Sequence, residues 1–103
     1  MRIAFVMSVN AGYEAEYRRR HNPIWPQLEA VLKSHGVHNY SIFLSWKTRQ
    51  LFAYAEIESE SQWAAIAKTQ ECQRWWHHMA DLMPRHADGS PVTEEIVEVF
   101  HMG

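Results

Sequence analysis

The feature that most constrains the fold of this chain is the order in which its hydrophobic pattern changes period. Alternation at every second residue, which is typical of strands, occupies Arg2–Val9, Val37–Trp46, Gln50–Glu58 and Val92–His101. Helical spacing occupies Tyr13–Ser34 and Ser59–Met83. The expected order is therefore strand, helix, strand, strand, helix, strand.

This order predicts an α+β domain of the ferredoxin-like, split βαβ type. Lys47–Arg49 is short and polar and predicts a hairpin, while each helical segment is long enough to connect parallel strands. Both helical segments would cover one face of a four-stranded antiparallel sheet. The other face carries apolar residues too, so we expect a homodimer in which two sheets pack face to face as a dimeric α/β barrel.

Local signals predict where the helices begin and end. Ser59 and Gln62 match a capping box, and Thr69 can cap a following helix that Pro84 would stop. Gly36 is a candidate left-handed cap after Ser34. Pro23 restricts the residue before it, so Asn22 is expected to cap a new helix with Pro23 in its first position.

Side-chain directions follow from the same patterns. In the second strand, His38, Tyr40 and Ile42 are expected to share one face. The helix after Thr69 is expected to bury one stripe, made of Cys72, Trp75, Trp76, Met79, Leu82 and Met83.

Composition limits the class of protein. The 103 residues form one domain, residues 1–103, with 47% hydrophobic residues and a net charge of -2. Arg18–Arg20 is too short a basic run to indicate nucleic acid and is expected to face solvent. No apolar run approaches the roughly 20 residues that cross a bilayer. The lone Cys72 and the lack of a signal-peptide layout favour the cytoplasm.

Several kinds of chemistry find little support. The adjacent His77 and His78 would point about 100° apart on a helix, which is poor geometry for one metal ion. Cys72 has no cationic neighbours in sequence and is expected to be a packing residue. No serine lies on a strand–turn–helix elbow, and the four glycines form no phosphate loop.

Aromatic residues are abundant: five Trp, four Tyr and four Phe. Phe5, Phe43, Phe52 and Trp63 are expected in the core. Trp75 and Trp76 are adjacent and cannot both face one point of a core, so one of them is free to line a pocket.

Tyr17 and His21 lie four residues apart and can share a helix face at a joint made by Pro23. A pocket with Tyr17, His21, Tyr40 and one tryptophan would suit a monosaccharide, whose hydroxyls bond polar groups while its C–H surface packs on aromatic rings.

The chain closely resembles the L-rhamnose mutarotase family over essentially its whole length. The most specific segments are the block His21–Pro26 and the pair Trp75–Trp76; others are Arg19–Arg20, Ala4–Met7, Leu28–Gly36 and Asn39–Tyr40. The loop Arg85–Gly89 departs from the asparagine-containing version expected there.

The resemblance implies a homodimer that interconverts the α and β anomers of L-rhamnopyranose without metal or organic cofactor. It implies His21 as the catalytic proton donor and Tyr17, Tyr40, Trp75 and Trp76 as substrate-binding residues. Two other classes remain open at this point: a ferredoxin-like monooxygenase, and a sugar-binding module without turnover.

Overall fold

The computed structural model describes residues 1–103 and contains four strands and four helices. In chain order these are β1 (Arg2–Ser8), α1 (Glu14–Arg20), α2 (Pro26–Ser34), β2 (Val37–Ser45), β3 (Gln50–Ile57), α3 (Glu60–Ile66), α4 (Gln70–His78) and β4 (Glu94–Ile96). The strands form one sheet in the order β2-β3-β1-β4, and every neighbouring pair is antiparallel. The predicted ferredoxin-like arrangement is confirmed.

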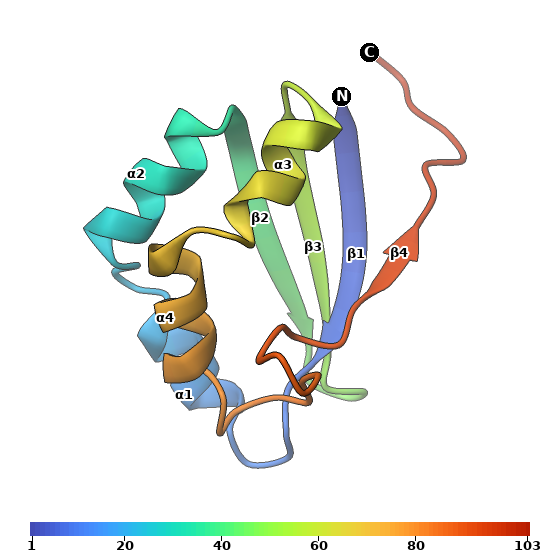
Figure 1. Cartoon of the computed structure of the whole chain (residues 1–103). Coiled ribbons are helices and arrows are strands. Elements are labelled where there is room, and N and C mark those ends of the chain that lie inside the picture. Colours follow the sequence, from blue (N-terminus) through green and yellow to red (C-terminus); the bar gives the residue numbers. More distant parts are fainter.

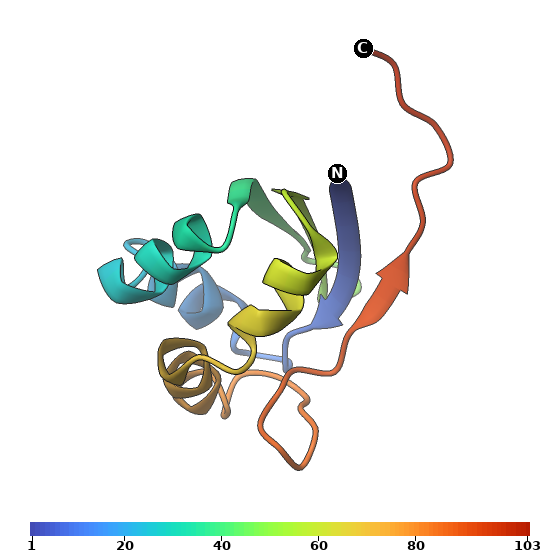
Figure 2. The same ribbon diagram turned by 45° about the horizontal axis from the view of Figure 1, so that its top comes forward.

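All four helices lie on one side of the sheet (Figure 1), and the turned view in Figure 2 agrees. The core lies between the sheet and the helices. The inward side chains of β3, which are Leu51, Ala53, Ala55 and Ile57, are at most 3% exposed. As predicted, they share one face of the strand, because successive strand residues point to opposite faces.

Three of the four predicted cap residues, Ser59, Thr69 and Gly36, are confirmed. Ser59 Oγ accepts from the backbone N–H of Gln62 at 3.1 Å, and Thr69 Oγ1 accepts from that of Cys72 at 3.2 Å. Gly36 follows α2 with a positive φ of 77°. A Cβ atom at this glycine would overlap the Glu58 side chain, so the position needs glycine for space as well as for conformation.

The joint between α1 and α2 differs from the prediction. Asn22 caps no helix; its side-chain amide donates to the Arg18 carbonyl at 2.7 Å, back toward α1. The next helix begins at Pro26, with Trp25 as its N-cap. Both prolines suit a first helical position, and the sequence did not distinguish between them.

The last two predicted elements are shorter than expected. Helix α4 ends at His78 rather than at Pro84, although Met79, Leu82 and Met83 remain buried. These residues lie in a turn in which the Leu82 carbonyl accepts from the backbone N–H of Asn10 at 2.7 Å.

Strand β4 pairs with β1 over three residues, and the chain then leaves the sheet (Figures 1 and 2). The prediction of a strand from Val92 to His101 is therefore wrong in length. Past Ile96 the segment has no partner strand within the chain, and Val97 is 85% exposed.

A bulge in β2 changes the expected side-chain directions. Pairing with β3 shifts by one residue between His38 and Ser41, and Asn39 has a positive φ of 48°. Val37 is consequently buried in the core, while His38 is exposed. The expectation that His38 shares a face with Tyr40 is wrong because the extra residue breaks the alternation.

The uncovered face of the sheet holds large apolar side chains that we expected in the core. Phe43 and Phe52 lie opposite each other in the β2–β3 ladder and are 65% and 39% exposed. Ile96 of β4 is 41% exposed. The core interpretation of the two phenylalanines is wrong because they lie on the side of the sheet that no helix covers.

Two further observations bear on the composition-based expectations. None of the helices combines the length and apolar character needed to traverse a bilayer. Within Arg18–Arg20, the first two residues are exposed as predicted, whereas the Arg20 side chain is only 15% exposed and contacts the end of α4.

Candidate active site

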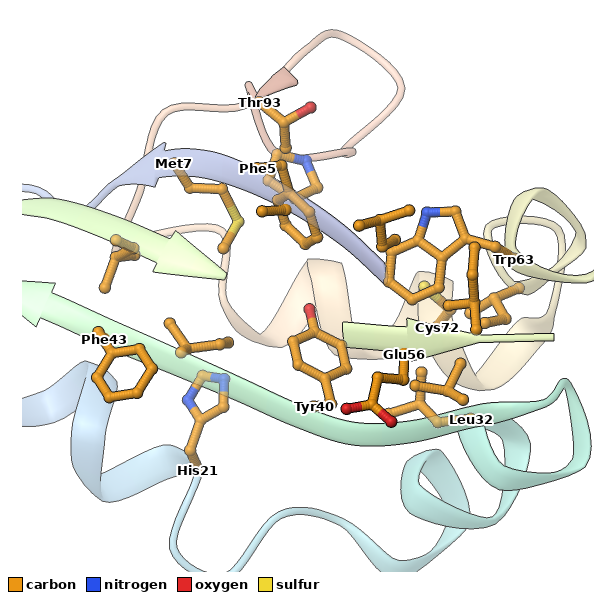
Figure 3. A pocket seen from close by; sticks show the side chains of 18 of the residues that line it. Phe5, Met7, His21, Leu32, Tyr40, Phe43, Glu56, Trp63, Cys72 and Thr93 are labelled. Carbon is orange, nitrogen blue, oxygen red and sulfur yellow. The ribbon is translucent and has the colours of Figure 1, made fainter. Parts of the chain in front are cut away.

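A cavity lies between the inner face of the sheet and the helices. Its wall includes all five predicted site residues together with further aromatic side chains: Tyr17, His21, Tyr40, Trp75, Trp76, Phe5 and Trp63. Figure 3 shows His21, Tyr40, Phe5 and Trp63 directed into this space from α1, β2, β1 and α3. The fold therefore brings together residues that are separated by up to 71 positions in the chain.

His21 is held at the end of α1 by two hydrogen bonds to that helix. Its backbone N–H donates to the Arg18 carbonyl at 3.2 Å. Its ring Nδ1 lies 2.9 Å from the Tyr17 carbonyl. Because a carbonyl oxygen only accepts, Nδ1 must carry the hydrogen, and Nε2 is left as the ring atom free to exchange a proton.

Aromatic rings fix the imidazole from two sides. The Tyr17 ring stacks on it with centroids 4.4 Å apart and planes inclined by 31°. The Trp75 ring meets it edge to face, with centroids 5.1 Å apart and planes at 85°. Trp25 supports Trp75 from behind in a second edge-to-face contact. The orientation of the imidazole is thus determined by packing as well as by its hydrogen bond.

The phenol groups of Tyr17 and Tyr40 make no hydrogen bond within the protein. The structure nevertheless has no fully buried side-chain polar atom without a partner. Both hydroxyls are therefore accessible from the cavity. They are free to bond a polar ligand.

Burial acts on the ionisation of these groups. It raises the pKa of Tyr17 and of Tyr40, and the nearby Tyr40 phenol adds to the effect on Tyr17. Both phenols are consequently neutral near pH 7 and act as hydrogen-bond donors. Burial also lowers the pKa of His21, while its bond to the Tyr17 carbonyl favours the protonated ring and opposes the shift.

A second aromatic group forms the other end of the cavity. Phe5 lies edge to face with Tyr40, with centroids 6.4 Å apart, and Trp63 packs 6.0 Å from both rings. The sequence assigned Trp63 to the core. It does pack against the core, and it also lines the cavity, because helical spacing that places a residue toward the sheet does not distinguish a core position from a cavity wall.

Trp75 and Trp76 occupy different environments, as their adjacency predicted. Trp75 is buried behind His21 at 9% exposure, and Trp76 is half-buried in the cavity wall. Cys72 is also buried, and burial raises the pKa of its thiol to about 11, so it is a packing residue rather than a nucleophile.

The histidines, acidic residues and Cys72 do not gather into a metal-binding group. No three side chains of these types come close enough together to hold an ion. The polar groups that line the cavity include the His21 imidazole and the two phenols, together with side chains such as Glu56 and Thr93 (Figure 3). An imidazole beside two phenols suits proton exchange and hydrogen bonding with a hydroxylated ligand.

Comparison with known proteins identifies the family. Residues 2–102 match the model of the L-rhamnose mutarotase family. This chain belongs to the L-rhamnose mutarotase family. As a member, it is an isomerase that exchanges the anomers of a carbohydrate.

Individual relatives agree with this assignment. The chain is 68% identical to an L-rhamnose mutarotase from Opitutus terrae and 60% identical to one from Yersinia pestis, in each case over 99% of this chain and 98% of the relative. The crystal structure of an L-rhamnose mutarotase from Formosa agariphila superposes with a TM-score of 0.91 at 38% identity, covering 100% of this chain and 99% of the other.

More distant structures share the fold alone. A putative antibiotic biosynthesis monooxygenase from Nitrosomonas europaea superposes with a TM-score of 0.65 at 16% identity, over 97% of this chain and 100% of the other. This likeness is consistent with the ferredoxin-like architecture and carries no information about activity.

Proposed function

We propose that this protein interconverts the α and β anomers of L-rhamnopyranose, with His21 as the general acid and base. The observation that carries the proposal is the arrangement at the end of α1. The imidazole is anchored through Nδ1 and leaves Nε2 free, in a cavity that also contains the unpartnered phenols of Tyr17 and Tyr40.

The reaction itself requires only proton transfers and a rotation. Opening the hemiacetal places a proton on the ring oxygen and removes one from the anomeric hydroxyl, as the C1–O5 bond breaks. Rotation about C1–C2 turns the aldehyde, and closure on its other face reverses both transfers. Neither the opening nor the closure of the ring needs a protein nucleophile, a redox group or a metal.

His21 would deliver the proton to the ring oxygen on opening and recover it on closing. Burial makes its imidazolium a stronger acid, and the Tyr17 carbonyl limits that shift. A histidine whose ordinary pKa is about 6.5 can thus donate and accept near neutral pH. Positioned acid–base catalysis of this kind contributes roughly 10²–10⁴-fold.

The other site residues would bind the sugar. Neutral phenols at Tyr17 and Tyr40 can donate to sugar hydroxyls, and one of them, or water, would relay the second proton. Trp75 and Trp76 would supply apolar surface for the ring and for the methyl group of the deoxy sugar. For Trp75 this contact is limited to its small exposed edge.

The test of His21 is saturation-transfer NMR on the two anomers of L-rhamnose. We expect His21→Asn to reduce the exchange rate by roughly 10²–10⁴-fold while the fold is retained. His35 provides a matched control. It also ends a helix with Nδ1 bound to a carbonyl four residues back, at 2.8 Å from Val31 O, but it does not line the cavity.

His35→Asn should therefore leave exchange unchanged. Wild-type exchange in His21→Asn would remove His21 from the mechanism. A wild-type protein that shows sugar-dependent thermal stabilisation but no acceleration of exchange would be a binding module, and the proposed activity would be wrong.

We also propose that the protein acts as a homodimer in the cytoplasm. The uncovered sheet face supports a second copy as its occupant, because it exposes the large apolar side chains Phe43, Phe52 and Ile96, and an exposed apolar patch marks an interaction site. The segment Val97–Gly103 is exposed throughout and ends beyond the sheet, where it could extend over that copy. The single free cysteine fits a reducing compartment.

A further inference from the structure

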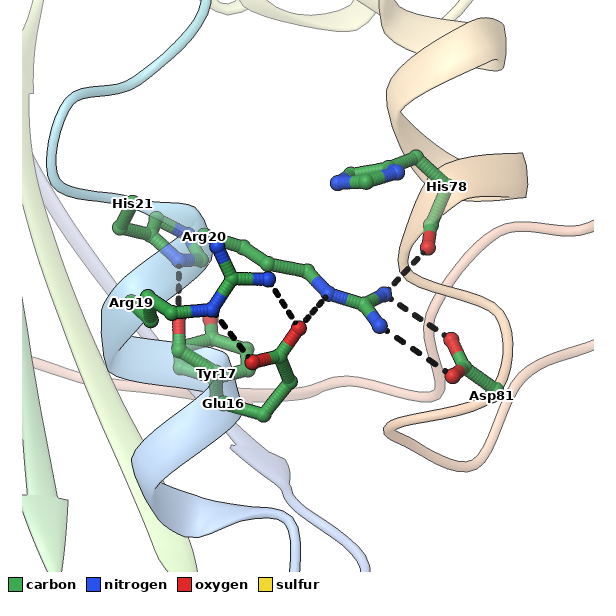
Figure 4. A network of polar contacts seen from close by, with 7 residues as sticks. All are labelled: Glu16, Tyr17, Arg19, Arg20, His21, His78 and Asp81. Carbon is green, nitrogen blue, oxygen red and sulfur yellow. Dashed lines mark hydrogen bonds and ion pairs between the residues drawn. The ribbon is translucent and has the colours of Figure 1, made fainter.

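Arg20 connects the end of α1 to the end of α4 and the turn after it through three acceptor atoms, and it bonds a fourth acceptor on α1 itself. Its Nη1 donates to the His78 carbonyl at 2.6 Å and to Asp81 Oδ1 at 3.0 Å, and its Nη2 reaches Asp81 Oδ2 at 3.3 Å. Its Nε donates to Glu16 Oε2 at 2.7 Å. Figure 4 shows the guanidinium between the two helices, with His21 at the adjoining end of α1.

The neighbouring Arg19 lacks this bridge. It bonds only Glu16, one turn earlier on the same helix, and its side chain is 71% exposed. The Arg20 side chain is 15% exposed. Two adjacent arginines therefore share one carboxylate, but only Arg20 crosses to α4. The bidentate contact with Asp81 also fixes the direction of the guanidinium.

The bridge lies next to the imidazole in both sequence and space. His21 follows Arg20 directly and is bound to α1, whereas the edge-to-face contact on its ring comes from Trp75 of α4. The position of the ring against Trp75 consequently depends on how the end of α1 sits against α4. Arg20 is the side chain that joins these two ends by hydrogen bonds to the α4 side.

We propose that Arg20 is a positioning residue that holds His21 in register with Trp75, so that Nε2 meets the ring oxygen of the bound sugar. This inference rests on the proposed role of His21. Arg20 does not line the cavity and would not touch the substrate.

The charges of the bridge are maintained over the working range of pH. Arg20 lowers the pKa of Asp81, and the two arginines together lower the pKa of Glu16 to about 2. Both carboxylates are therefore ionised near pH 7, and the bridge is intact at the pH at which His21 would exchange protons.

The experiment compares Arg20→Gln with Arg19→Gln by anomer-exchange NMR at several L-rhamnose concentrations. We expect Arg20→Gln to lower kcat by roughly 10- to 100-fold, because a misplacement of about 1 Å can have an effect of that size. The KM should remain within about twofold, since no sugar contact is removed. Arg19→Gln should leave both parameters at their wild-type values.

A second arm addresses the state of the ring and the risk of misfolding. Asp81→Asn removes the charge of the partner but keeps the size of its side chain, and it should also lower kcat, as Arg20→Gln does. In both Arg20→Gln and Asp81→Asn, the ¹⁵N signals of His21 should shift, whereas in Arg19→Gln they should stay in place. If Arg20→Gln does not fold, Asp81→Asn alone decides the matter.

The inference is overturned if folded Arg20→Gln and Asp81→Asn have a wild-type kcat, or if their loss appears in KM with an unchanged His21 signal. Including His21→Asn separates this result from failure of the proposed function. An inactive His21→Asn with fully active bridge variants would refute only the positioning role, whereas an active His21→Asn would refute the mechanism on which it rests.

Discussion

The two faces of β3 show how differently one strand can be used. Toward the helices, Leu51 has no exposed surface, whereas its neighbour Phe52, on the opposite face, is 39% exposed. The inner face completes a core and a cavity within one chain. The outer face is equally apolar in places but has nothing in the chain to cover it. Stability of the domain and assembly of the protein should therefore depend on alternate residues of the same strand.

The largest effect should follow from creating a void on the inner face. Leu51→Ala removes a fully buried side chain and should lower the free energy of unfolding by about 2–5 kcal/mol. Urea denaturation monitored by tryptophan fluorescence measures this. The loss should not depend on protein concentration, whereas the loss from Phe52→Ala should, because only the latter weakens an interface between copies. If the stability losses from Leu51→Ala and Phe52→Ala depended equally on protein concentration, the proposed distinction between the two faces would be wrong.

The next effect concerns assembly. Phe43 lies on the edge strand β2 and is 65% exposed on the outer face, so Phe43→Lys should preserve the fold but place a charge inside the proposed dimer interface. We expect the dissociation constant of the dimer to rise by roughly 100-fold, in line with the cost of losing an aromatic anchor. Sedimentation velocity measures the association state. Gln27→Lys, on exposed α2, adds the same charge and should leave it unchanged; a dimer that survives Phe43→Lys would place the interface elsewhere.

The smallest expected effect is a pH dependence of the folding stability, caused by His21 on the helix-covered side of the sheet. Because burial lowers the pKa of folded His21, the unfolded chain binds a proton first as the pH falls below about 6.5. Folding stability should therefore decrease from pH 6.5 down to the native pKa, by at most about 1.4 kcal/mol for each pH unit in that window. Above pH 6.5 the imidazole is neutral in both states and contributes nothing.

Urea midpoints measured from pH 8 to pH 5 test this dependence before most carboxylates titrate. His21→Gln should give a flatter profile than the wild type over that range. A wild-type protein that became more stable on acidification, with the effect removed by His21→Gln, would mean that the folded site favours the charged imidazole.

The sequence was sufficient where local periodicity decided the structure. The alternation from Leu51 to Ile57 predicted the buried side of β3, and the hydroxyl caps at Ser59 and Thr69 predicted two helix starts. It was insufficient where pairing decided. The bulge at Asn39 is set by how β2 meets β3, and the length of β4 by where the chain leaves β1, so neither left a local pattern.

The site followed the same division. Tyr17 and His21 could be placed together from their spacing on one helix turn, and the structure confirms their contact. Tyr40 could be suggested as a partner in the same pocket, but no spacing fixed its position, because it lies on a strand far along the chain; its substrate-binding role came from the family resemblance. Neither spacing nor resemblance indicated Trp63 as a wall of the cavity or Arg20 as a bridge between helices, since both depend on where α3 and α4 pack.

The buried thiol of Cys72 has a practical consequence. It lies in the wall of the cavity, close enough to Tyr40 to affect that phenol's pKa, and its own pKa of about 11 keeps it unreactive while covered. Because the chain has no other cysteine, a thiol-specific reagent can react at one place only. The rate of that modification would report how often the aromatic wall around Cys72 opens. If added sugar slows the modification, the size of the decrease would measure how much of the protein has sugar in its cavity, without any engineered label.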